Sequence, residues 1–172
     1  MSNWSSRLTG AARAALVLFV ATSVSPAGVS AVTGVKSSLA QAPLKQEPLA
    51  LSMASGEITI NVEVAQSGEQ KTKGLMFRKS LDERAGMLFP YGQPQEITMW
   101  MKNTYMPLDM VFIRGDGTIH RIEAMTEPFS EATIASQGLV TAVLELNGGA
   151  AARMGLKAGD KVRHPAFQVG NR

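Results

Sequence analysis

The segment Met99–Ile113 (MWMKNTYMPLDMVFI) constrains the fold more than any other part of the chain. Its second half, Leu108–Ile113, is short and almost continuously apolar, which predicts a strand buried on both faces, in the middle of a sheet or in a barrel wall. Lys102, Asn103 and Asp109 interrupt the apolar residues. Polar groups among apolar neighbours cost free energy unless they find partners, so these three serve either the structure or a function.

Shorter patterns predict the rest of the domain. Residues 58–64 alternate between apolar and polar side chains, which is typical of a half-buried strand. Ser67 and Gln70 have the spacing of a capping box, which predicts a helix that ends near Met76. Further strands are predicted over residues 86–89, 97–102, 118–125, 139–146 and 161–164, and further helical segments over 130–135 and 150–154. Together these predicted strands and helices indicate an α+β domain with a small, mostly antiparallel, barrel-like sheet and two or three short helices.

The N-terminus has the pattern of a secretory signal peptide. Arg7 and Arg13 precede the apolar run 14–21, which is shorter than the roughly 20 residues of a membrane-spanning helix. Small residues follow, and cleavage after Ala31 or after Ala40 fits the small-x-small rule. The sequence therefore predicts export to the periplasm or beyond the cell. The alternative is an uncleaved segment that anchors the protein to the membrane.

The remainder divides into a linker, a domain and a tail. Residues 32–55 are rich in Ala, Ser and Pro and are predicted to be a disordered linker. Residues 56–165 are predicted to form a single globular domain, and residues 166–172 a tail.

Charge and cysteine content exclude several classes of function. The formal net charge is +3, but the first 40 residues hold three basic residues and no acidic one, so the rest of the chain is neutral. A neutral domain lacks the basic surface that nucleic-acid binding requires. The chain has no cysteine, so Cys/His catalysis, disulfides and lipoprotein attachment are excluded. No zinc or phosphate-loop spacing occurs, and no cofactor is implied.

Several short motifs occur in an order that resembles one family. They are Gly74-Leu75-Met76-x-Arg78, Gly86-Met87-Leu88-Phe89, Trp100-Met101-Lys102-Asn103-Thr104, Pro107-Leu108-Asp109, Leu144-Glu145 and Gly159-Asp160-x-Val162. Over roughly residues 56–164 this pattern resembles the domain of unknown function 192, also called uncharacterised protein family 0127. The resemblance implies that the protein is exported or associated with a membrane, and it supplies no catalytic residues.

The polar residues of the opening segment form the first candidate site. Trp100, Lys102, Asn103 and Asp109 could line a pocket that binds a small ligand or a component of the envelope. The structural alternative is an ion pair between Lys102 and Asp109, with Asn103 satisfying backbone groups of a turn. The favoured function is therefore a non-enzymatic accessory protein of the cell envelope that binds a ligand or partner.

Two other functions remain as alternatives. Glu145 could pair with Asp109 or Asp160 in an envelope hydrolase that acts on a glycan or another polymer, although the sequence does not fix their separation. Met99, Met101 and His120 could bind Cu(I), since thioethers are soft ligands that favour it. Methionine also fills gaps in cores, and residues 99 and 101 share a strand face with Ile97, which favours packing.

Overall fold

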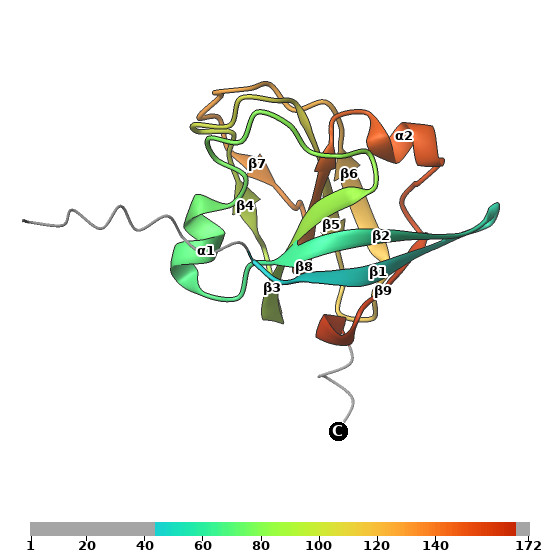
Figure 1. The fold of residues 1–172 in the computed structure, drawn as a ribbon. Coiled ribbons are helices and arrows are strands. Elements are labelled where there is room, and N and C mark those ends of the chain that lie inside the picture. Colours follow the sequence, from blue (N-terminus) through green and yellow to red (C-terminus); the bar gives the residue numbers. More distant parts are fainter. Residues whose placement is uncertain (1–43, 168–172) are drawn as a thin grey trace, which may run out of the picture. The chain divides into compact units, whose positions relative to one another are not determined.

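The structure is a computed structural model, and it describes residues 44–167. Two short α-helices and nine strands follow one another along this part of the chain (Figure 1). Their bounds are β1 Gln46–Met53, β2 Gly56–Val64, α1 Gly68–Lys73, β3 Ala85–Gln95, β4 Thr98–Met99, β5 Leu108–Ile113, β6 Ile119–Glu123, β7 Ile134–Ala135, β8 Val140–Asn147, α2 Ala150–Met154 and β9 Lys161–Arg163, with a 3-10 turn, η1, at Pro165–Phe167. Within residues 44–167, the helices are too short to cross a membrane.

Seven strands form one sheet in the order β6-β5-β8-β3-β2-β1-β9. The β2–β3 pair is parallel and the other pairs are antiparallel. The small strands β4 and β7 pair separately. The predicted α+β class is confirmed. The predicted barrel-like closure is not confirmed, because the sheet contains a parallel pair and its strands do not close into a barrel. A single bridge, between Thr118 and Lys161, joins the two edges of the sheet.

The linker prediction is wrong for its C-terminal part, where β1 forms. This strand pairs along its whole length with β2 and, near its end, with β9. Leu49 and Leu51 are fully buried, so β1 belongs to the core. The period-two pattern of Leu49, Leu51 and Met53 carried the signal, but Pro48 and the surrounding small residues obscured it. The predicted signal peptide, with cleavage after Ala31 or Ala40, lies outside the described residues.

Some local predictions hold and others change in extent. The capping box of Ser67 and Gln70 is present, and the helix ends at Lys73 because Gly74 adopts a positive φ of 45°. Strand β3 continues through Pro90 with a shift in register. The strand expected over residues 97–102 shrinks to β4, and the helical turn expected over 130–135 is replaced by β7, which pairs with β4.

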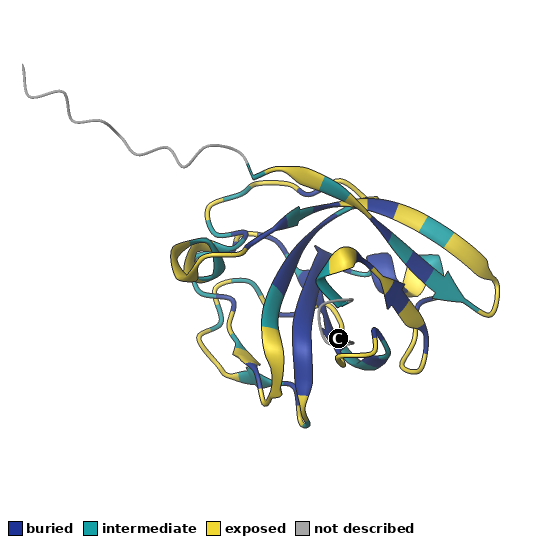
Figure 2. Ribbon diagram, turned by 90° about the horizontal axis from the view of Figure 1, so that it is seen from below, coloured by how far each residue is buried: buried dark blue, intermediate teal, exposed yellow. Residues whose placement is uncertain are grey.

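The sheet separates two apolar clusters. All residues of β5 are buried, as are all but the last of β8, and Figure 2 shows buried strands running through the interior of the domain. Leu144 and Leu146 belong to one cluster, while Val143 and Met110 belong to the other. Successive side chains of a strand point to opposite faces, so these two strands present residues to both clusters. This alternation decides where the polar residues of β5 and β8 point.

Candidate functional site

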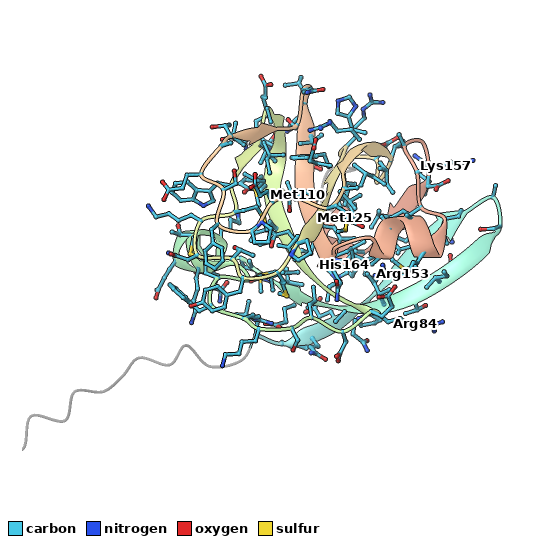
Figure 3. All side chains as sticks on the ribbon, turned by 90° about the horizontal axis from the view of Figure 1, so that it is seen from above. Arg84, Met110, Met125, Arg153, Lys157 and His164 are labelled. Atoms are coloured by element: carbon cyan, nitrogen blue, oxygen red, sulfur yellow. The ribbon has the colours of Figure 1, made fainter. Side chains whose placement is uncertain are left out.

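Asp109 is a structural residue that organises the start of α2. Its side chain is fully buried and accepts hydrogen bonds of 2.9 Å from the backbone N–H groups of Met125, Gly149 and Ala151. A short helix leaves its first N–H groups without intrahelical partners, and a carboxylate satisfies them well. Figure 3 shows Met125 close to this helix, from which Arg153 projects.

Lys102 and Asn103 also act locally. The Nζ atom of Lys102 lies 3.5 Å from the carboxylate of Glu131 and 5.3 Å from the centre of the Trp100 ring. Asn103 adopts a left-handed φ of 56°, which asparagine tolerates better than most residues. The predicted ion pair between Lys102 and Asp109 is therefore wrong, because each has other partners. Of the four candidate residues, Trp100 alone lines the cavity described next.

A cavity of about 220 Å³ lies between helix α1, strand β3 and the β4 segment. Its wall combines apolar and aromatic side chains with hydroxyl and ammonium groups. The lining residues are Lys71, Thr72, Lys73, Gly74, Leu75, Met76, Phe89, Tyr91, Thr98, Met99, Trp100, Thr104 and Glu145. An apolar concavity with a few converging polar groups is the usual form of a small-molecule site.

Glu145 is the only acidic residue that lines this cavity. It sits on the central strand β8 with an exposed fraction of 5%, and no hydrogen bond or ion pair to its carboxyl group is formed within residues 44–167. Burial raises its pKa to about 8, and the charge of Arg78 opposes this rise. The Arg78 guanidinium is already bound to Glu63, with N–O distances of 2.5 and 2.7 Å. At neutral pH the Glu145 carboxyl is therefore mostly protonated, and it can both donate and accept a hydrogen bond.

Lys71 and Tyr91 lie together in the cavity wall that also contains Glu145. Lys71 Nζ lies 4.6 Å from the centre of the Tyr91 ring, and burial lowers the pKa of this lysine. Burial and the nearby Glu145 charge raise the pKa of Tyr91, which therefore keeps its hydroxyl proton. The Tyr91 hydroxyl is 3.8 Å from the sulfur of Met99. These groups give the cavity wall a phenol hydroxyl and an ammonium group beside an aromatic face, and Lys73 adds a second ammonium group.

The carboxylate pair of the hydrolase alternative is not assembled. Asp109 lies opposite Leu146 in the β5–β8 ladder, whereas Glu145 lies opposite Met110. Directly opposed residues share a face and successive residues alternate, so Asp109 and Glu145 point to opposite faces of the sheet. Asp160 has a local role instead, since its carboxylate accepts a hydrogen bond from the backbone N–H of Lys157 within a turn.

The residues proposed for Cu(I) have separate partners. Met101 is fully buried, and its sulfur accepts a hydrogen bond of 3.1 Å from the Thr126 hydroxyl. The two ring nitrogens of His120 lie 2.8 Å from the Arg114 guanidinium and 3.2 Å from the Gln137 carbonyl oxygen. Within the described part of the chain, no group of three histidine, aspartate or glutamate residues could hold a metal ion. These contacts favour the packing role that the shared strand face indicates.

A second hollow lies beside β1 and the 3-10 turn η1, lined by Glu47, Tyr91 and His164 among others. The Nδ1 atom of His164 accepts the backbone N–H of Ala166 at 3.2 Å, and its Nε2 atom lies 3.3 Å from a carboxylate oxygen of Glu47. His164 thus links the end of the domain to β1.

Sequence reasoning missed the cavity because α1, β3 and β4 form it jointly. It considered Glu145 only as half of a carboxylate pair, and it did not consider Lys71 or Tyr91. A usable signal was present, since Glu145 is the single charged residue in the mostly apolar run Val140–Leu146. A lone carboxyl in a buried strand requires either a partner or a cavity.

Residues 44–167 thus form an α+β fold with a cavity of about 220 Å³ beside a buried carboxyl. The chain belongs to the DUF192 family, described as "Uncharacterized ACR", whose model matches residues 50–164. This confirms the predicted family and moves the start of the domain into β1.

Solved structures similar to this chain include the following two proteins. A protein from Sinorhizobium meliloti 1021, named provisionally as a transcription regulator, shares 43% identity with a TM-score of 0.69, over 72% of this chain and 96% of that one. A protein of unknown function from Novosphingobium aromaticivorans DSM 12444 shares 38% identity with a TM-score of 0.70, over 73% of this chain and 89% of the other. No curated protein matches the chain.

Proposed function

We propose that this protein is an exported, non-enzymatic accessory protein of the cell envelope that binds a small ligand or the end of a larger one in the cavity over Glu145. The observation that carries the proposal is the carboxyl itself, which is buried, lacks a protein partner within residues 44–167 and lines an open cavity. A protonated carboxyl in this position can donate a hydrogen bond to a ligand that enters the cavity and accept one from it.

Binding is favoured over catalysis by the composition of the cavity wall. Glycoside hydrolysis normally uses two carboxyl groups on either side of the scissile bond, and this wall holds one. No observation on this chain favours the regulatory role that the name of the Sinorhizobium protein suggests. The charge balance after residue 40 argues against nucleic-acid binding.

A fragment screen tests the cavity. Small alcohols, amides, amines and carboxylic acids are added singly to the isotope-labelled protein, and the indole N–H resonance of Trp100 reports occupancy by NMR. We expect a subset of fragments to shift this resonance in the wild type and to lose their effect in Glu145→Leu. Glu96→Leu is the matched control, because Glu96 is exposed and does not line the cavity. Equal shifts in both variants, or no shift with any fragment, would reject the proposed site.

Export has a separate test. The full chain is expressed in a bacterial host, the cell fractions are separated, and the mass of the mature protein is measured. We expect a periplasmic product whose first residue is Val32 or Gln41. A full-length product retained in the cytoplasmic fraction would contradict export.

A further inference from the structure

Three exposed aromatic residues form a continuous patch, here called the aromatic platform: Phe77, Tyr105 and Phe129. Their exposed fractions are 57%, 43% and 59%. Tyr105 is central, since its ring centre lies 6.2 Å from that of Phe77 and 5.4 Å from that of Phe129. Single exposed apolar residues are common, but a contiguous aromatic group on a surface usually marks an interaction site.

The backbone holds two of these rings in an unfavourable conformation. Phe77 has a φ of 65° and Phe129 a φ of 63°. A left-handed conformation costs a residue with a side chain about 1–2 kcal/mol, and bulky residues are rarely found in it. Exposed rings return little of this cost through burial. Strain that persists without a folding benefit indicates that the position of the rings is needed for another purpose.

The platform is continuous with the cavity wall. Met76 and Thr104 line the cavity, and the next residue of the chain in each case belongs to the platform. The backbone N–H of Phe129 bonds to the Thr104 carbonyl at 3.2 Å, which ties the third ring to the same wall. Consecutive Cα atoms are 3.8 Å apart, so the backbone positions of Phe77 and Tyr105 adjoin those of residues that line the cavity.

The charges around the platform are balanced. Lys102 is paired with Glu131, and Arg78 is paired with Glu63. The platform itself therefore carries no excess charge that would attract an anionic membrane or a charged peptide. The cavity adds the ammonium groups of Lys71 and Lys73, which donate hydrogen bonds, so platform and cavity together suit a ligand with flat apolar faces for the rings and hydroxyl groups for the cavity.

We infer that the platform and the cavity form one binding site for a neutral carbohydrate chain, with a terminal sugar over Glu145 and the following sugars stacked on the aromatic platform. This inference rests on the proposed function and names its ligand class. A pyranose ring presents C–H groups with partial positive charge on its faces, and these complement the negative face of an aromatic ring. Its hydroxyl groups both donate and accept hydrogen bonds, as does a protonated carboxyl.

Binding as a function of chain length tests this inference. The probes are β-1,4-linked oligomers of N-acetylglucosamine and of glucose with one to four units, titrated by calorimetry into the full domain. We expect at least one series to bind at least tenfold more tightly as the tetramer than as the monomer. The double variant Phe77→Asn/Phe129→Asn removes two rings and remains folded, because asparagine tolerates the left-handed conformation. This double variant should bind the tetramer no more tightly than the monomer, and its affinity for the monomer should equal that of the wild type.

Leu139→Ser is the matched control, since Leu139 is exposed to 65% and lies outside the platform; it should bind like the wild type. Glu145→Leu should abolish binding of every oligomer. An affinity that does not depend on oligomer length, or no binding by either series, would overturn the carbohydrate inference. The fragment screen would still decide separately whether the cavity binds small molecules. A second assay is sedimentation of the protein with phosphatidylethanolamine–phosphatidylglycerol vesicles. If the wild type binds the vesicles, the double variant does not, and no saccharide binds, the carbohydrate inference is overturned and the platform is a membrane-binding surface.

Discussion

The buried carboxyl of Glu145 predicts an unusual dependence of stability on pH. In the unfolded chain its pKa is near the ordinary value of 4.5, and in the folded protein burial raises it to about 8. Between these values the native state holds a proton that the unfolded state has lost, so the free energy of unfolding falls as pH rises. Below 4.5 both states are protonated, and the contribution of Glu145 does not change.

The size of the effect follows from the shift. Each unit of pKa difference corresponds to about 1.4 kcal/mol, so the pKa difference at Glu145 lowers the free energy of unfolding, relative to its value at low pH, by about 3 kcal/mol at pH 7 and by about 5 kcal/mol well above pH 8. Glu145→Gln keeps the shape and removes the proton equilibrium. The stability of the wild type relative to this variant should therefore fall by about 2 to 3 kcal/mol between pH 5 and pH 7.

Urea denaturation at pH 5, 7 and 9, followed by tryptophan fluorescence, measures this difference. His164, whose pKa is lowered by burial, is present in both proteins and cancels in the comparison. Arg78 and Tyr91 lie close enough to affect Glu145 and are also common to both. Glu96→Gln, an exposed control, should follow the wild type at every pH. Parallel stability profiles for the wild type and Glu145→Gln would refute the reasoning, because they would mean that Glu145 is ionised in the folded protein at neutral pH.

Three further predictions concern the fold. Asp109→Asn should lower the free energy of unfolding by about 2–4 kcal/mol, because an amide cannot accept all three buried N–H groups; an equal stability in urea would show that the cap is dispensable. Ser67→Ala should cost about 1 kcal/mol by removing half of the capping box, and a loss below about 0.3 kcal/mol in the same assay would contradict that role. A chain that starts at Gly56 should fail to fold by circular dichroism while one that starts at Gln41 folds, because only the longer chain contains β1; a cooperative transition in the shorter chain would refute this.

Local patterns in the sequence predicted much of the fold. The bounds of β5 and of α2 agree with the expectation, as does the capping box of Ser67. Each depends on residues close together in the chain, whose periodicity and capping chemistry act at short range. Strand β1 was missed because a β-strand is stabilised by its neighbours, and its partners β2 and β9 are identified only by the sheet.

The sequence alone determined the family, the α+β class and the presence of an acidic residue in each of two predicted strands. Tertiary structure decided what those residues do. Asp109 and Glu145 are both acids in apolar strands, yet three N–H groups meet the first and an open cavity meets the second. The register between β5 and β8 places them on opposite faces. Register and cavity shape arise from contacts between segments far apart in the chain, and no local pattern contains that information.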